Sequence, residues 1–477
     1  MIWKSNLPDL SEKYKMEKTI KYIILITGFS IAMGSCTTPQ HFHRENGDTS
    51  GLYGTTATTD SVTLADKPWS EIFSERHLLV LIQEGLKNNP DLQIAVQKVN
   101  EADAYFKQSK ASLLPDLSLL ANGSYTRNPE TLYPQGPFNI GAYQLGAEAS
   151  WEIDIWGKLR SSKRAAYATL LASDAGKKEV QTRLISDIAT AYYALIGLDA
   201  KLVITRETVK NDVEQVETMK ILKESGKVTG AAIVQTEANR YAAEVTIPDL
   251  EQQIRETEAV ICLLLGRVPG PINRGKIEEQ KLPTVLKAGI PARLLDNRPD
   301  VLQAEFGVMG AYETTNSARA SFYPALTLTA TAGFVATDLT HFFDPTTFAA
   351  NIIGGLTQPL LNKKVNITRL KVAKAQQEEA LISFRNTLLK AGQEVYNSLS
   401  SYEFSVQKIA LRKLQLESLV KSVDYTKQLL TYGSANYTEV LTAQTNLLSA
   451  QLSSINDRLQ QLNAIVNFYR AVGGGWK

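Results

Sequence analysis

The sequence has little of what marks most familiar protein classes. Only two of its 477 residues are cysteines, Cys36 and Cys262, which argues against a disulfide framework. Lysine and arginine together number 51 against 49 for aspartate and glutamate, so the charge favours neither nucleic acid nor a strongly acidic partner. The chain has no run of 18 or more apolar residues, which excludes a conventional transmembrane helix.

Groups for catalysis or metal binding are equally sparse. The four histidines are scattered, and no spaced set of His, Cys and carboxylate residues recurs along the chain. His41 and His43 are neighbours, but they fall in a polar segment expected to be flexible, where solvated side chains are the simpler interpretation. Gly226-Lys227-Val228-Thr229 lacks the upstream glycine and the Ser or Thr directly after lysine that a phosphate loop needs. We therefore predict no enzyme, no metal site and no cofactor.

The N-terminal segment has the layout of an export signal. A basic stretch, Met16 to Lys21, precedes the apolar run from Tyr22 to Ala32. The run ends in Met33-Gly34-Ser35-Cys36, which resembles a bacterial lipoprotein signal whose cysteine is lipidated and becomes the mature N-terminus. The alternative is a plain secretory signal with an incidental cysteine. Export across the inner membrane follows from either.

These features divide the N-terminal region into two predicted parts. Residues 1–35 are the signal peptide, with Met16 as an alternative start. Residues 36–68 form a polar, Thr- and Gly-rich tether carrying a lipid on Cys36.

From Trp69 onward the chain repeats its own layout. Asn89-Pro90-Asp91 is matched by Arg298-Pro299-Asp300, with 299−90 = 209. The other matches are Pro115 with Pro324 (324−115 = 209), Tyr192 with Tyr396 (396−192 = 204), Gly226 with Gly433 (433−226 = 207) and Gly266 with Gly473 (473−266 = 207). Solenoid repeats have periods of about 20–50 residues. The spacing therefore indicates a tandem duplication of a much larger unit.

Each predicted repeat contains strands with two different faces. The longest alternating segment has one apolar set: Tyr143, Leu145, Ala147, Ala149, Trp151, Ile153 and Ile155. The opposite set is Gln144, Gly146, Glu148, Ser150, Glu152 and Asp154. An apolar face backed by three carboxylates fits lipid outside and water inside. We predict hairpins over 116–156 and 325–361. A half-buried sandwich strand is the alternative, but usual strands have only about 5–6 residues.

A very long helical pattern follows each hairpin. Apolar residues recur at alternating spacings of three and four, which is coiled-coil periodicity. A helix from Lys158 to Ser225 would extend roughly 100 Å at 1.5 Å per residue. No compact domain contains such a helix, so we predict coiled-coil hairpins over 158–265 and 364–472. Gly226 and Gly433 are the predicted tips, because glycine readily ends a helix in the left-handed conformation.

The predicted strands require an oligomer. Four strands cannot close a barrel, and an open sheet edge in lipid leaves backbone groups unpaired at several kcal/mol each. Single-chain barrels have at least about eight strands. Three copies would supply twelve strands above a helical barrel, although the residues alone leave the copy number open.

Several motifs resemble the TolC-like outer-membrane efflux proteins. They are Arg298-Pro299-Asp300, Ala304-Glu305, Ala318 to Pro324, Ile155 to Lys158 and Tyr437 to Gln444. Within this family they are most similar to the lipoproteins that work with resistance-nodulation-division pumps. The resemblance implies an α+β membrane protein: a homotrimer with a twelve-stranded outer-membrane barrel and a periplasmic helical tunnel. It also implies a periplasmic adaptor and an inner-membrane pump as partners.

The resemblance completes the predicted domain plan. Residues 69–266 form the first repeat and 298–477 the second, with 267–297 as the linker between them. Each repeat has a helix, a β-hairpin and a coiled-coil hairpin.

Candidate functional residues lie at both ends of this plan. The family commonly has aspartate rings just inside the periplasmic mouth, one of them nine residues after the second tip glycine, where this chain has Thr442. Glu439 is then the nearest candidate for a carboxylate ring at the gate, with a solvated glutamate as the alternative. Glu148, Glu152 and Asp154 are predicted to line the barrel lumen, with pairing to Arg or Lys of a neighbouring strand as the alternative.

The predicted function is a passive exit duct for small molecules such as drugs. A duct for type I protein secretion or metal cations would share the fold and differ in partners. Only Met219 and Met309 follow Cys36, so no methionine-rich path for a soft metal is visible. A structural coiled-coil lipoprotein is the non-transport alternative, and the alternation around Glu148 argues against it. The sequence does not name the cargo.

Overall fold

The computed structural model describes residues 63–127, 139–281 and 291–476, together with Phe42, Leu52, Pro129 and Leu286. The chain divides into two compact units, 1–45 and 46–477, and the description below concerns the second. The predictions for the signal peptide, Cys36, His41 and His43 lie outside the described residues.

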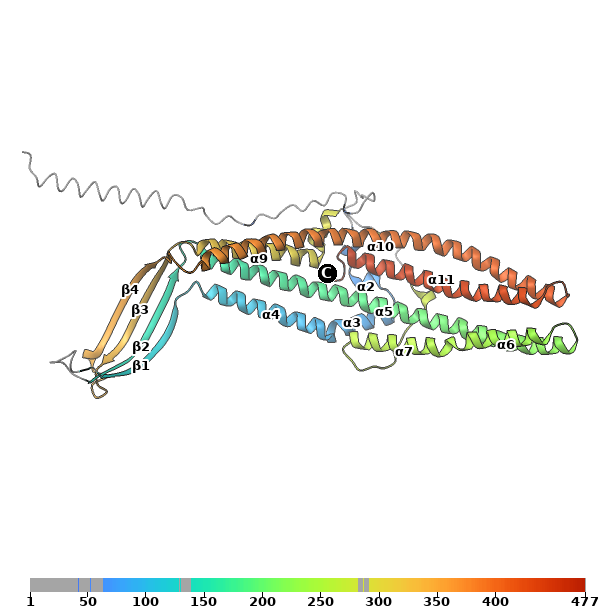
Figure 1. Cartoon of the computed structure of the whole chain (residues 1–477), viewed down its shortest axis with the longest axis horizontal. Helices are drawn as coiled ribbons and strands as arrows, with labels where there is room; N and C mark the ends of the chain where they lie inside the picture. Colours follow the sequence, from blue (N-terminus) through green and yellow to red (C-terminus); the bar gives the residue numbers. More distant parts are fainter. Residues whose placement is uncertain are drawn as a thin grey trace, which may run out of the picture. The chain divides into compact units, whose positions relative to one another are not determined.

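The two halves of the described chain share one central order: a helix, a β-hairpin and a long helix that is followed by helix leading back from the tip (Figure 1). The first half contains α2 (Trp69–Ile72), α3 (Arg76–Asn88), α4 (Pro90–Ala111), β1 (Asp116–Arg127), β2 (Asn139–Ile153), α5 (Lys158–Glu224), α6 (Gly230–Glu244) and α7 (Thr246–Leu264). The second contains α8 (Leu294–Asn297), α9 (Pro299–Ala320), β3 (Ala325–Ala336), β4 (Phe348–Thr357), α10 (Val365–Thr431) and α11 (Tyr437–Ala471). Short 3-10 turns are η1 (Leu64–Asp66), η2 (Ile277–Glu279), η3 (Pro291–Arg293) and η4 (Pro345–Thr347).

Corresponding elements agree in length. Helices α5 and α10 each have 67 residues, and α4 and α9 each have 22. The helical segment that leads back from each tip differs between the halves. In the second half it is one helix of 35 residues, α11, whereas in the first half it is divided into α6 and α7 at Val245. Pro248 explains the break: its ring lacks an N–H and clashes with the carbonyl four residues earlier, at Glu244, where α6 ends. The sequence-based coiled-coil hairpin over 158–265 therefore has a divided second arm.

The four strands form one antiparallel sheet in the order β1-β2-β3-β4. Its register places apolar residues beside apolar residues, as in the row Leu119, Ala147, Ala332 and Ala350. The opposite face of the sheet carries the polar row Ser118, Glu148, Thr331 and Asn351. The predicted alternation thus holds largely through β1, β2 and β3 and is less regular in β4, where Ile353 falls on the polar face. The apolar face is not covered within the chain, since Leu119 is 87% exposed.

The helices pack lengthwise in layers. Helix α5 lies between α4 and α9, and α10 packs on α9 and α11 (Figure 1). The core lies midway along α5, where Ile188, Tyr192 and Leu195 are fully buried. One 18-residue window of α5 is apolar enough to span a membrane by length and composition, but 56% of that window is buried in the bundle. Core packing therefore accounts for its hydrophobicity.

Both predicted tips end their helices in the same way. Gly226 has φ +71° and Gly433 has φ +73°, the left-handed region that glycine adopts without strain. At the first tip, the N–H of Gly226 donates to the carbonyl of Lys223 and that of Lys227 to Leu222, both at 2.9 Å. The second tip repeats this pattern, which is the Schellman motif.

Candidate functional site

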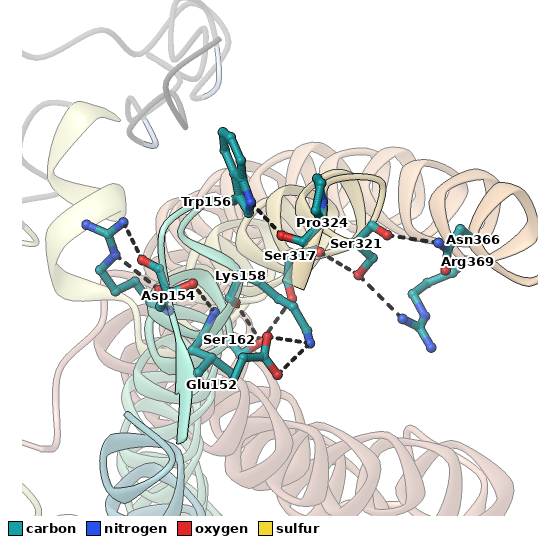
Figure 2. A network of polar contacts seen from close by, with 12 residues as sticks. Glu152, Asp154, Trp156, Lys158, Ser162, Ser317, Ser321, Pro324, Asn366 and Arg369 are labelled. Atoms are coloured by element: carbon teal, nitrogen blue, oxygen red, sulfur yellow. Dashed lines mark hydrogen bonds and ion pairs between the residues drawn. The ribbon is translucent and has the colours of Figure 1, made fainter. Parts of the chain in front are cut away.

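Two of the three carboxylates that were predicted to line the lumen, Glu152 and Asp154, bind partners at the base of the sheet (Figure 2). Glu152 accepts hydrogen bonds from the Lys158 ammonium at 2.9 and 3.2 Å, so the cation comes from the start of α5 and not from a neighbouring strand. Glu148 lies in the middle of the polar row, and within the described residues it has no ion pair. Of the three predicted lumen carboxylates, Glu148 is the one for which no ion pair forms among the described residues.

Asp154 lies one residue beyond the end of β2 and caps the N-terminus of the next helix, α5. Its carboxylate accepts the backbone N–H of Leu159 at 3.1 Å and that of Arg160 at 2.9 Å, and it pairs with the Arg160 guanidinium at 3.1 Å. These are first-turn N–H groups of α5, which have no partner inside the helix. A carboxylate also stabilises the positive end of the helix dipole. The structure thus places Asp154 as a helix cap, with a side chain only 9% exposed.

A tryptophan ties the two hairpins together at the same level (Figure 2). The Trp156 indole N–H donates to the Pro324 carbonyl at 2.8 Å, and its ring stacks on Tyr323 with centroids 4.9 Å apart. Nearby, the hydroxyls of Ser162 and Ser317 are 2.9 Å apart, which links α5 to α9. The sequence motifs contained Trp156, Tyr323 and Pro324, but only the structure brings Trp156 and Pro324 together across 168 positions.

The second tip exposes the predicted gate residues. Glu439 lies in the first turn of α11, where its N–H donates to the Asn436 side chain at 3.1 Å. Glu439 and Thr442 are exposed, whereas Tyr437 and Val440 on the other side of the helix are buried. The Thr442 hydroxyl donates to the carbonyl of Thr438, so it is engaged with its own helix.

Behind that exposed face, polar side chains join the two coiled-coil hairpins. The Gln444 amide of α11 donates to Gln215 of α5 at 2.7 Å, and Gln215 donates to the Tyr437 hydroxyl at 3.3 Å. Burial raises the pKa of Tyr437 above its ordinary value, so the phenol remains a neutral hydrogen-bonding group. The tips are thus connected through α5 and α11.

Ion pairs with buried carboxylates hold the long helices together between the tips and the sheet. Arg164 of α5 makes a bidentate contact of 2.7 and 2.9 Å with Glu313 of α9, whose side chain is 3% exposed. Asp457 of α11 pairs with Arg412 and Lys408 of α10. Burial would raise the pKa of Asp457, but hydrogen bonds from these two cations outweigh it and lower the pKa below its ordinary value.

No group of three or more His, Cys, Asp or Glu side chains among the residues that the structure describes is placed to hold a metal ion.

Comparison with known proteins agrees with this geometry. The chain is 28% identical over 430 residues to the solvent efflux pump outer membrane protein SrpC of Pseudomonas putida, covering 90% of this chain and 92% of that protein. It is 27% identical over 419 residues to the cation efflux system protein CusC of Escherichia coli, covering 86% and 88%. The open-state outer membrane channel MtrE of Neisseria gonorrhoeae has a similar fold, with a TM-score of 0.83, 23% identity and coverage of 93% and 99%.

The family description "Outer membrane efflux protein" matches two segments, residues 81–267 and 290–474. Together they include both hairpins and both pairs of long helices. The chain therefore belongs to the outer membrane efflux protein family and is an outer-membrane component of efflux.

Proposed function

We propose that the chain forms the exit duct of a tripartite efflux system and passively exports small molecules delivered from the inner membrane. The observation that carries this proposal is the sheet: one face carries apolar residues in all four strands, with Leu119, Leu145 and Ile352 exposed, and the other face is predominantly polar in β1, β2 and β3. Lipid fits the first face and a water-filled lumen the second. The protein moves cargo without chemistry of its own, and a partner pump supplies the energy.

The assembly is a homotrimer built from duplicated units. Among the described residues, β1 and β4 are the outer strands and each pairs on one side only, and lipid does not tolerate open edges. Three four-stranded sheets would close a barrel of about twelve strands. The two separate family matches and the equal lengths of α5 and α10 support a tandem duplication, with repeats over 69–266 and 298–477 joined by 267–297.

The partners are a periplasmic adaptor and an inner-membrane pump of the resistance-nodulation-division class. The adaptor meets the tips at Gly226 and Gly433, where a Cβ would find nothing within 4 Å. Relatives named for solvent efflux support small organic cargo, and relatives named for cation efflux support metal cations as the alternative. A type I secretion system would use the same duct with an ATP-driven exporter.

Conductance tests both the duct and its gate. Purified wild-type protein in planar bilayers should give discrete single channels. If Glu439 of the three copies forms a ring at the mouth, Glu439→Ala should lower the preference for cations over anions severalfold, because three negative charges leave the constriction. Unchanged conductance and selectivity would remove Glu439 from the gate while leaving the duct in place.

A matched variant separates a local effect from a general charge effect. Glu217 is an exposed glutamate of α5 near the first tip, paired with Lys220 at 2.7 Å. Glu217→Ala removes the same charge from the other hairpin and should leave selectivity unchanged. Absence of any channel from wild-type protein in several lipid compositions would contradict the duct itself.

Lipidation of Cys36 is compatible with the reach of the chain. Leu52 lies against α10 at Gly392, where an added Cβ would be 2.8 Å from the Leu52 carbonyl oxygen. Gly392 is 27 residues after Val365 (392−365), about 40 Å along the helix from the sheet end. The 16 residues from Cys36 to Leu52 (52−36) extend to about 55 Å at most. An acyl chain on Cys36 can therefore reach the inner leaflet of the outer membrane.

Cys36→Ser tests this anchor. Wild-type protein should incorporate labelled palmitate in growing cells, and the variant should incorporate none, because the acceptor thiol is gone. Cys262→Ser, which changes a buried thiol, should label like wild type. Equal labelling of Cys36→Ser and wild type would show that the lipid is elsewhere.

A further inference from the structure

A buried arginine binds three helices together in the second half of the chain. The Arg298 guanidinium donates to both carboxylate oxygens of Asp300 in α9, to Glu394 of α10 and to the Ala471 carbonyl of α11. Its side chain is almost fully enclosed. One cation therefore satisfies two carboxylates and a backbone carbonyl at this place.

The first half of the chain keeps the acceptors of this site but lacks the cation. Corresponding residues are 209 positions apart before the strands, and 207 apart in the long helices and after them (299−90 and 433−226). The position of Arg298 is therefore held by Asn89 (298−209). The corresponding acceptors are Asp91 for Asp300 (300−209), Asp187 for Glu394 (394−207) and Leu264 for Ala471 (471−207).

A hydrogen bond in the first half agrees with this correspondence. The Asn89 amide donates to the Leu264 carbonyl at 2.8 Å, as the Arg298 guanidinium donates to the Ala471 carbonyl at 3.1 Å. The Asn89 side chain also accepts the N–H of Leu92 at 2.9 Å and so caps α4. Since it is short and uncharged, Asn89 cannot replace the guanidinium between the two carboxylates.

Those two carboxylates are left without a partner. Among the residues that the structure describes, neither Asp91 nor Asp187 forms an ion pair or a side-chain hydrogen bond. Desolvation by the surrounding protein raises the pKa of Asp187, and the charges of Arg470 and Arg183, which form no ion pair with it, oppose that effect only in part. A cation in direct contact would remove this cost.

The place that the guanidinium would occupy belongs to an open groove. The groove lies between α4 and α5, has a volume of about 410 Å³ and is lined by Asn89, Asp91 and Asp187 among others. Both aspartates are exposed, whereas Asn89 is buried at the base. Sites for small molecules have volumes of about 300–1,000 Å³. The groove is therefore large enough to admit a ligand from solvent.

The cations that line the same groove leave the two aspartates unpaired. Lys177 pairs with Asp174 at 2.8 Å, and Arg183 is 3.7 Å from Glu179. Lys98 also lines the groove and forms no ion pair within the described part of the chain. These positive charges favour a ligand with a single charge over a polycation.

We propose that this groove binds a small organic cation with a guanidinium head, in the place that Arg298 fills in the second half. The planar fork of a guanidinium donates two parallel hydrogen bonds to one carboxylate and has further N–H groups for a second, which suits Asp91 and Asp187. A metal ion fits less well, because no group of three or more ligating side chains forms among the described residues. This site does not depend on the proposed duct.

Saturation-transfer NMR with methylguanidinium tests the site in the purified full-length protein. The wild type should give a transfer signal at millimolar ligand. Asp187→Asn should lower that signal roughly fivefold or more, because one of the two charged acceptors is lost. Asn89→Arg should lower it as far, since its own guanidinium would fill the same place from within the chain.

A matched variant and a second cation are the controls. Asp249, like Asp91, is an exposed carboxylate in the first turn of a helix, and Asp249→Asn should keep the wild-type signal. Tetramethylammonium has the same charge as methylguanidinium but no N–H donor, so an excess of it should not displace the ligand. A native mass equal to that of wild type verifies that each variant is folded.

The outcomes separate this site from the duct. Absence of a signal from wild type, or a signal that folded Asp187→Asn retains, would overturn the site. Displacement by tetramethylammonium would show a general attraction for cations and overturn the guanidinium site as well. None of these results would alter the single-channel conductance that tests the duct.

Discussion

Replacing Gly333 by alanine is expected to abolish most of the assembled protein. Gly333 of β3 lies directly opposite Gly146 of β2, at the junction between the two hairpins. A Cβ on Gly333 would collide with the carbonyl oxygen of Leu145 and the Cα of Gly146, and both are backbone atoms that cannot rotate away. Overpacking of this kind costs about 1–3 kcal/mol, and more where the strands themselves must separate. We expect a severalfold loss of folded, heat-resistant oligomer on seminative gels of outer membranes.

Gly123→Ala is the matched control for this experiment. Gly123 lies in β1, and its nearest neighbour for an added Cβ is a ring carbon of Tyr143 at 3.4 Å, an ordinary contact with a side chain. Its folded fraction should stay close to that of wild type. If Gly333→Ala assembled as well as Gly123→Ala, the close approach of β2 and β3 would not be a requirement of the fold.

Replacing Arg298 by alanine is expected to destabilise the helical region by about 3 kcal/mol, as breaking a buried ion pair does. Its side chain is 6% exposed and joins three elements. The guanidinium donates to both Asp300 oxygens at 2.9 and 2.6 Å, to Glu394 of α10 at 2.7 Å and to the Ala471 carbonyl of α11 at 3.1 Å. Burial would lower the pKa of Arg298, yet hydrogen bonds and charges from the two carboxylates raise it above its ordinary value. Urea titration followed by circular dichroism should show a lower midpoint.

Two further variants test the cause of that loss. Arg298→Lys keeps the charge but not the planar fork, so it should recover only part of the stability. Arg206 forms an exposed pair with Glu251, with side chains 57% and 43% exposed, and Arg206→Ala should cost less than about 1 kcal/mol. Equal midpoints for Arg298→Ala and Arg206→Ala would show that the buried network does not stabilise the protein.

The predictions from local pattern were the accurate ones for the fold. The helix expected from Lys158 to Ser225 is present as α5, because nothing in that stretch interrupts its periodicity. The hairpins end earlier than expected, at Ile153 and Thr357 instead of residues 156 and 361. Asp154 turns to cap α5, and Pro359 cannot donate to a ladder. The division of the returning arm could have been read from Pro248.

The candidate sites were less accessible to sequence reasoning. The carboxylates were recognisable as a polar face, but Glu152 and Asp154 find their partners in the turn that leads into α5. That turn depends on Gly157, which adopts φ +75°. This geometry, and not the alternation, decides which of the three acidic residues has no ion pair among the described residues.

By itself, the sequence determined the two-faced strands, the long helices, the glycine tips and the need for a partner at the sheet edges. The strands and helices follow from periods of two and of about three and a half residues, and the tips follow from the conformational freedom of glycine. The need for a partner follows from the number of strands. All of these can be recognised in local stretches of the chain. Only the tertiary structure decided that Gly146 meets Gly333, that Trp156 locks onto Pro324 and that Arg298 joins three elements. These contacts join residues about 100 to 190 positions apart, and their register is set by packing between elements, which no local period encodes.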